Sequence, residues 1–441
     1  MIGSMRKINK LIPELRFPEF VNDGEWEERT VGDLYDFHVT NSFSREYLNY
    51  EDGVVKNIHY GDIHTKFNTH FDIVKEQVPY INSNVPIDKI KDESYCREGD
   101  VIFADASEDL NDIGKCIEII NLNFEKVVSG LHTLIARQKG SLLIIGFGGF
   151  LFKTFGVRKQ IQKEAQGAKV LGISVRRISD VIISYPHNHK EQYKITFCLA
   201  SLDDVIVFHN QKLEALKDHK KGLMQILFPQ EGEKVPKLRF PEFAEDGEWV
   251  EKNLDGICKL VRGPFGGSLK KEIFVKDGYA VYEQSHAIYG DFNSFRYYID
   301  DKKYSELKRF SVKNGDLIMS CSGTMGKFAL IPQNYKVGVI NQALLKLTIK
   351  KGFNNKFVKM TLESENNQNK LLSQSAGGAI KNVVSVSQIK ELELLIPSIE
   401  EQQKIASCFS SLDHIITAQT EQIEQLKLYK KGLMQGLFPK I

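Results

Sequence analysis

The chain has 441 residues, more than one ordinary domain needs and enough for two modules that each bury a core. Hydrophobic residues make up 42% and charged residues 26% of it, and a formal net charge of +2 does not by itself indicate a nucleic-acid partner. No segment approaches the roughly 20 apolar residues that span a bilayer, and no apolar run follows the start, so we expect a cytoplasmic protein without a membrane partner. The six cysteines are scattered singly, which favours reduced thiols over a zinc site or disulfides.

Matching motifs divide the chain into two similar halves. LRFPEF at 15–20 with DGEW at 23–26 returns at 238–243 and 246–249, and KKGLMQ at 220–225 with LFP at 227–229 returns at 430–435 and 437–439. Weaker echoes follow in the same order: GDxI at 99 and 315, EQ at 191 and 401, SLD at 201 and 411. The interiors barely match, as duplication followed by divergence of a recognition surface would leave. Ordinary drift of a duplicated fold is the alternative.

The repeat predicts a segment order along the chain. We expect a flexible N-terminal extension over 1–14, a first module over 15–187, a first long helix over 188–228, a linker over 229–237, a second module over 238–397 and a second long helix over 398–438. The linker is inferred from a polar, turn-rich junction with a proline near each end.

Apolar residues in both predicted helices recur at alternating spacings of four and three. This heptad pattern is typical of supercoiled helices. The first helix carries it at Ile195, Leu199, Leu202, Ile206, His209, Leu213, Leu216 and Leu223, and the second at Ile405, Phe409, Leu412, Ile416, Gln419, Ile423, Leu426 and Leu433. A polar residue in such a seam penalises slipped registers, which we expect of His209 and Gln419. A lone seam histidine is more often packed than metal-bound, so no metal is expected.

The two helices would most simply pair with each other as an antiparallel coiled coil. A helix from about 192 to 226 is roughly 50 Å long at 1.5 Å per residue. Such a rod would hold two reading heads about one turn of a DNA duplex apart. A dimerisation coiled coil with no measuring role is the alternative.

In the order of these motifs, the sequence resembles the specificity (S) subunits of type I restriction-modification systems over nearly the whole chain. Further matches are SGTMGK at 322–327, VINQ at 339–342 and a PxxxEQ helix entrance at 397–402. The resemblance implies two α/β (mixed α+β) target-recognition domains that each read one half of an interrupted double-stranded DNA site. It also implies a non-catalytic chain whose helices bind two modification (methyltransferase) subunits. Those partners would use S-adenosylmethionine to methylate adenine, and restriction subunits would add ATP- and Mg-dependent cleavage.

Candidate DNA-contacting residues lie in segments that mix basic and amide side chains with glycine and aromatics. Arginine or lysine reads guanine and asparagine or glutamine reads adenine, while phosphate contacts set position. In the first module, expected loops at 60–67 and 107–115 offer Tyr60, His64, Thr65, Lys66, Ser107 and Lys115. In the second, expected loops at 262–270, 282–286 and 322–327 offer Arg262, Phe265, Ser268, Lys270, Tyr282, Gln284, His286, Ser322, Thr324 and Lys327, with Asn341 and Gln342 in VINQ. Lys169 and Lys381 adjoin glycines and suit phosphates. The alternative is solvated turns that touch no DNA.

Signals of catalysis are few. LLIIGFGG at 142–149 resembles a strand that runs into the glycine turn of a cofactor-binding methyltransferase, but its counterpart at 350–355 is merely polar. The chain contains no Asn/Asp-Pro-Pro-aromatic motif for amino methylation and no GxxxxGK[ST] loop. His187 and His189 form an HxH without further ligands in metal spacing. A self-contained DNA adenine methyltransferase and a coiled-coil adaptor without a DNA role remain the alternatives.

Overall fold

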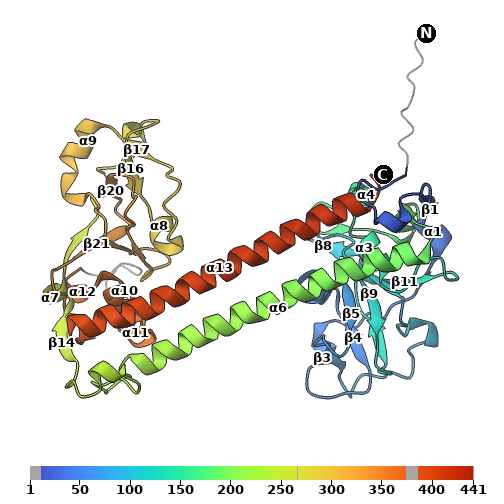
Figure 1. Ribbon diagram of the computed structural model, residues 1–441, viewed down its shortest axis with the longest axis horizontal. Coiled ribbons are helices and arrows are strands. Elements are labelled where there is room, and N and C mark those ends of the chain that lie inside the picture. The colour runs from blue at the N-terminus through green and yellow to red at the C-terminus, as the bar shows by residue number, and fades with distance from the viewer. Residues whose placement is uncertain (1–10, 266, 374–385, 441) are drawn as a thin grey trace, which may run out of the picture. The chain divides into compact units, whose positions relative to one another are not determined.

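The computed structural model describes residues 11–265, 267–373 and 386–440, and it divides into two compact units (Figure 1). The first unit comprises Met1–Gln211 with Glu421–Ile441, and the second comprises Lys212–Thr420. Two long helices, α6 (His189–Leu227) and α13 (Ile399–Leu437), each contribute to both units. Most of the expected N-terminal extension lies outside the described residues.

The first unit contains a mixed five-stranded sheet and a smaller sheet beside it. The larger sheet has the order β2 (Tyr35–His38), β11 (Thr133–Gln138), β7 (Val101–Ala104), β9 (Cys116–Asn121), β5 (His70–Asp72), and the smaller has the order β10 (Val127–Ser129), β4 (Lys56–Ile58), β6 (Tyr80–Ile81), β3 (Leu48–Asn49). Two-stranded pairs join β1 (Glu27–Thr30) to β13 (Ile182–Tyr185), and β8 (Ala106–Ser107) to β12 (Leu171–Gly172).

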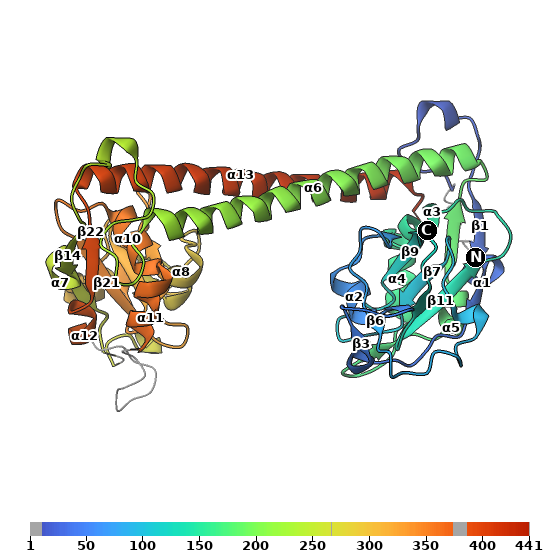
Figure 2. The ribbon, with the colours of Figure 1, turned by 90° about the horizontal axis from the view of Figure 1, so that it is seen from below.

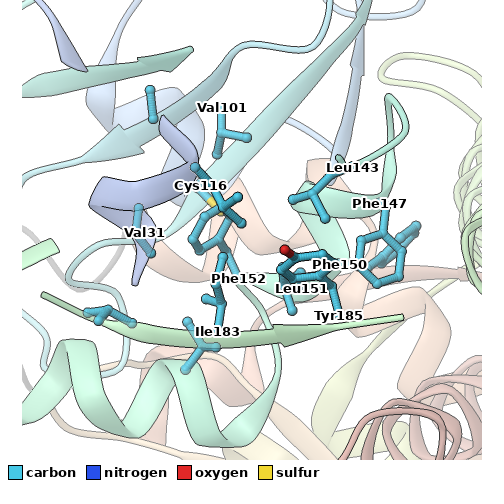
Figure 3. Packing of buried hydrophobic residues seen from close by; sticks show 14 of the residues in the cluster. Val31, Val101, Cys116, Leu143, Phe147, Phe150, Leu151, Phe152, Ile183 and Tyr185 are labelled. Carbon is cyan, nitrogen blue, oxygen red and sulfur yellow. The ribbon is translucent and has the colours of Figure 1, made fainter. Parts of the chain in front are cut away.

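The central strand β7 is buried on both faces. Because side chains alternate along a strand, Val101 and Phe103 enter one hydrophobic core while Ile102 and Ala104 enter another. Five short helices surround these sheets: α1 (Val31–Leu34), α2 (Tyr60–Thr65), α3 (Phe147–Leu151), α4 (Phe155–Glu164) and α5 (Val175–Ser179). Figure 3 shows Phe147 and Phe150 from α3 packed near Tyr185 from β13.

The second unit repeats this arrangement with different side chains. Its larger sheet has the order β15 (Cys258–Arg262), β21 (Leu344–Ile349), β18 (Leu317–Ser320), β19 (Phe328–Leu330), and its smaller sheet the order β17 (Tyr298–Ile299), β16 (Tyr279–Tyr282), β20 (Gly338–Ile340); β14 (Val250–Asn253) pairs with β22 (Glu393–Ile396). The helices are α7 (Leu254–Ile257), α8 (Gln284–Tyr289), α9 (Asp301–Glu306), α10 (Asn355–Glu363), α11 (Glu365–Ser373) and α12 (Val386–Lys390). Strand β18 alternates between two cores as β7 does.

The repeated end motifs of the helices pack against the repeated tryptophans. In the first unit, Phe438 after α13 meets Trp26 edge to face, with ring centroids 5.7 Å apart. In the second unit, Phe228 after α6 meets Trp249 in the same way at 5.9 Å. The start of α6 and the end of α13 therefore share one core in the first unit, and the end of α6 and the start of α13 share one in the second.

The expected seam positions of both long helices are buried or half-buried, whereas most residues between them are exposed. Ion pairs accompany this seam in each unit. Lys430 on α13 pairs with Asp203 on α6 in the first unit, and Lys220 on α6 pairs with Asp413 on α13 at 2.5 Å in the second. Figure 2 shows the start of α6 and the end of α13 beside the elements of the first unit. No helix among the described residues combines the length and apolarity needed to cross a membrane.

Candidate nucleic-acid interface

In the second unit, the ends of two parallel strands bring predicted DNA-contacting residues together. Strands β16 and β20 run side by side with Tyr282 opposite Ile340, so Gln284 and Asn341 follow at neighbouring places. The Asn341 backbone N–H donates to the Tyr282 carbonyl at 3.0 Å. The Gln284 side chain donates to the carbonyl of Ser322, in the segment that follows β18. Three segments that are far apart in the sequence therefore form one polar surface.

Arg262 lies beside this surface at the end of β15. The next residue, Gly263, must be glycine, because a Cβ there would lie 1.8 Å from the Asn341 carbonyl oxygen. The Nη1 atom of Arg262 is buried and has no hydrogen-bond partner among the residues that the structure describes. A buried guanidinium nitrogen without an acceptor is unusual and suits an acceptor supplied by a ligand.

The other candidates of the second unit differ in their exposure. Exposed residues are Phe265, Lys270, Thr324, Lys327 and Gln342, and half-buried residues are Ser268 and Ser322. Lys381 lies outside the described residues.

Two of the second unit's candidates are buried and have protein partners, so their side chains do not reach the surface in this structure. Tyr282 is fully buried in β16, where burial raises the pKa of its phenol and its hydroxyl donates to the Lys336 carbonyl at 2.6 Å. His286 is buried in α8 and stacks on Phe295 with ring centroids 4.7 Å apart. The expected loop at 282–286 is instead a strand end and a helix.

In the first unit, the segment 60–67 is mostly the helix α2 rather than the expected loop. Its first turn is held by His59, whose Nδ1 accepts from the Gly61 N–H at 3.0 Å. Helix α2 adjoins the other expected loop, because His64 Nε2 lies 3.1 Å from the Ala106 carbonyl and Lys115 Nζ lies 3.4 Å from the His64 carbonyl. The two predicted segments of this unit therefore form one surface.

A short strand pair on this surface contains Ser107 and is preceded by Lys169. Ser107 is buried, and its hydroxyl accepts from the Asp109 N–H at 3.1 Å. Its strand β8 pairs with β12, with Ser107 opposite Leu171. Lys169 is exposed in the segment just before β12.

The exposed end of α2 carries a polar and aromatic cluster that sequence reasoning found only in part. Lys66 Nζ lies 3.0 Å from Asp62 and 3.2 Å from the Tyr50 hydroxyl, and Arg45 binds both oxygens of Asp62 at 2.9 Å. The Thr65 hydroxyl donates within the helix to the Gly61 carbonyl at 2.8 Å. The sequence does not point to Arg45 and Tyr50 as candidates, because residues 45–50 contain no glycine and have no matching motif in the second half of the chain.

The backbone N–H groups of the glycine turn at 146–149 donate to a side chain of the same unit. Residues 142–145 form no strand, which corrects the expectation from the sequence. The two oxygens of Glu118 accept from the N–H groups of Gly146 and Gly149 at 2.7 and 2.6 Å. Burial raises the pKa of Glu118 to about 7, and the two hydrogen bonds oppose that rise. The donors that would hold a cofactor's anionic group are therefore taken.

The paired histidines near the start of α6 have ordinary protein partners. His187 lies 3.5 Å from Glu27, and His189 Nε2 lies 3.2 Å from the Leu142 carbonyl. Within the described part of the chain, no three His, Cys, Asp or Glu side chains gather as metal ligands would.

The fold of this chain is similar to that of solved components of type I restriction-modification systems. The S subunit from M. genitalium superposes with a TM-score of 0.55 at 14% identity, covering 97% of this chain and 99% of that one. A chain from a structure that describes complex assembly and conformational transition of the type I R-M system superposes with a TM-score of 0.55 at 14% identity. The match covers 94% of this chain and 98% of that one.

Sequence comparison leads to the same family. Residues 246–428 match the "Type I restriction modification DNA specificity domain". The MjaX specificity subunit of Methanocaldococcus jannaschii, named as part of a type I restriction enzyme, is 25% identical over 346 residues, which are 77% of each chain. In sequence and in fold, this chain is therefore similar to the specificity subunits of type I restriction-modification systems.

Proposed function

We propose that this chain selects a bipartite double-stranded DNA site, with each unit reading one half. The observation that carries the proposal is the gathering of Gln284, Ser322 and Asn341 beside Arg262, whose buried Nη1 atom has no hydrogen-bond partner among the described residues. Amide and guanidinium groups are the usual readers of adenine and guanine in the major groove. In the first unit, α2 follows β4, which pairs in parallel with β10 as β16 pairs with β20, and it carries different side chains, as two different half-sites require.

We propose further that α6 and α13 form an antiparallel coiled coil that spaces the two readers. The two ion pairs support this arrangement. Asp203, near the start of α6, pairs with Lys430 near the end of α13, whereas Lys220, near the end of α6, pairs with Asp413 near the start of α13. An antiparallel pair has this order. Basic and acidic partners beside a heptad seam also fix orientation.

The helices would also dock two modification subunits. On α6, Tyr193 and Phe197 stack with ring centroids 6.1 Å apart and are 62% and 60% exposed. Exposed aromatics on a helix suit a partner surface. S-adenosylmethionine would be carried by the modification subunits, and ATP and Mg would be used by restriction subunits, in a cytoplasmic complex.

The test exchanges residues 15–185 for the same segment of a relative that recognises another sequence. Methylated adenines are then mapped across the genome with and without this chain. We expect one half of the recognised site to change and the other to stay. A site that keeps both halves after the exchange would contradict the proposal.

A second experiment separates spacing from reading. Leu216→Glu places a charge in the seam and should abolish assembly with the modification subunits, while the exposed Lys217→Glu should not. Measurable S-adenosylmethionine binding by the isolated chain would instead favour a self-contained methyltransferase, and failure to bind any duplex with partners present would favour an adaptor.

A further inference from the structure

An aspartate and a histidine that the sequence motifs do not mark meet beside α2 in the first unit's candidate interface. His132 Nδ1 lies 3.3 Å from Asp105 Oδ1, and the His132 ring lies edge-on to Tyr60 with centroids 5.5 Å apart. Asp105 directly follows β7, and His132 directly precedes β11. The pair therefore lies where the central strands of the large sheet reach the surface that carries α2.

The backbone of His132 is held in a conformation that most residues avoid. Its φ is +58°, in the left-handed region, which costs a residue with a Cβ free energy and occurs preferentially at functional sites. Two hydrogen bonds hold this turn. The Asp105 N–H donates to the His132 carbonyl at 3.0 Å, and the Ser129 hydroxyl donates to the Thr133 hydroxyl at 2.5 Å. The chain keeps a histidine where glycine would fit without strain.

The pair opens into a surface pocket of about 560 Å³. Its polar lining comes from Asp105, His132, Gln166, Ser174 and Arg177. The side chains of His132 and Asp105 are 49% and 27% exposed, so both reach the pocket and the solvent. The pocket lies against the β8–β12 strand pair, next to the segment that carries Lys169.

The second unit has no such pair at the corresponding places. Cys321 directly follows β18 and is buried, and Ala343 directly precedes β21. An ion pair that stabilised the fold common to both units should occur in both of them. The tryptophan contacts do so. The Asp105–His132 pair instead belongs to what differs between the units.

We propose that Asp105 and His132 read the exocyclic amino group of one cytosine or adenine in the first half-site, an inference that rests on the proposed function. With Asp105 ionised, His132 donates from Nδ1, which leaves Nε2 of the neutral ring as an acceptor. The second oxygen of Asp105 is an acceptor as well. Acidic side chains accept from cytosine N4, and adenine presents the same amino chemistry at N6. The histidine orients the carboxylate through this hydrogen bond.

The test uses the complete complex of this chain with its modification subunits. The complex is incubated with duplexes of randomised sequence, and the bound duplexes are sequenced for the wild type, Asp105→Asn and His132→Gly. Glycine suits the left-handed backbone, so the second variant removes the ring without adding strain. Asp36→Asn is the matched control, because Asp36 forms an exposed pair with Lys139 at 3.1 Å on the outer strand β2.

We expect Asp105→Asn and His132→Gly to weaken discrimination at one base pair of one half-site by about tenfold or more. The other half-site and Asp36→Asn should keep the wild-type preference. A C·G or A·T preference of the wild type at the affected position identifies which amino group is read.

Three results would overturn the inference: unchanged preference at every position, an equal loss of affinity for all sequences, or a change in the half-site that exchange of residues 15–185 leaves unaltered. A wild-type complex that selects no site would overturn the proposed function itself.

Discussion

Arg16 donates two hydrogen bonds, from Nε and Nη2, to the two carboxylate oxygens of Glu191, each at 2.7 Å. Arg239 binds Glu401 in the same way at 2.8 and 2.6 Å. Both pairs are buried, and each joins the LRFPEF motif of a module to the first turns of the long helix that follows it. Two motifs that appear separate in the sequence are thus the two partners of one contact, which fixes the direction in which each helix leaves its module.

Glu191→Ala should destabilise the first unit by about 3 kcal/mol or more, because it leaves the buried guanidinium of Arg16 unpaired. The chain contains two tryptophans, Trp26 and Trp249, one in each unit. In a Trp249→Phe background, tryptophan fluorescence during urea unfolding therefore reports on the first unit alone. Asp36→Ala, which breaks the exposed pair with Lys139, is the control and should leave the midpoint nearly unchanged. Equal midpoints for the two variants would contradict this role of the buried pair.

Arg262→Ala should lower discrimination at one position of the second half-site by about 1–3 kcal/mol, because a guanidinium beside this polar surface suits the acceptors of a guanine. Lys270→Ala removes an exposed charge in the same segment and should weaken binding uniformly across sequences, with a smaller salt dependence. Binding of the assembled complex to randomised duplexes at two salt concentrations distinguishes the two effects. A uniform loss for Arg262→Ala would make it a phosphate contact instead.

The sequence predicts features that depend on periodicity. The seam positions from Ile195 to Leu223 in the first helix and from Ile405 to Leu433 in the second are an example, because a heptad pattern follows directly from residue spacing. The GDxI echoes likewise mark the starts of the central strands β7 and β18. Side-chain exposure at the interface is harder to predict. Tyr282 and His286 look like binding residues, yet they fill a core because their strand and helix turn them inward.

Contacts between distant segments are also hidden from a single sequence. Asp105 and His132 lie 27 residues apart with no shared motif, and only the pairing of β7 with β11 brings them together. The residues 142–145 are apolar enough for a strand, but the glycine turn that follows is held by Glu118 from another strand. Tertiary hydrogen bonds decide such segments, and local propensity does not.

Asp203 and Lys430 should show favourable coupling of up to about 1 kcal/mol, because their pair is only partly exposed to solvent. The measurement is a double-mutant cycle of Asp203→Ala, Lys430→Ala and the double variant, read by urea unfolding in the Trp249→Phe background. The same cycle on Lys220 and Asp413, which are more exposed, should give a smaller coupling when read from Trp249 in a Trp26→Phe background. Purely additive effects for Asp203 and Lys430 would contradict their pairing.

Glu118 should make the first unit less stable as the pH rises. Burial raises its pKa in the folded protein to about 7 from an ordinary value of 4.5, so the folded state holds its proton more tightly than the unfolded chain does. The resulting stability is fully present below pH 4.5 and is lost as the pH rises to about 7, a fall of about 3 kcal/mol in the free energy of unfolding. Urea unfolding of the first unit between pH 4.5 and 8 measures it.

Glu118→Gln cannot titrate at this position, so its free energy of unfolding should not fall between pH 4.5 and 7. At low pH it should be less stable than the wild type, because an amide cannot accept from the N–H groups of both Gly146 and Gly149. Glu28→Gln, which changes an exposed carboxylate of the same unit, should keep the wild-type pH dependence. If the wild type and Glu118→Gln instead lose stability in parallel over this range, the titrating group lies elsewhere in the unit.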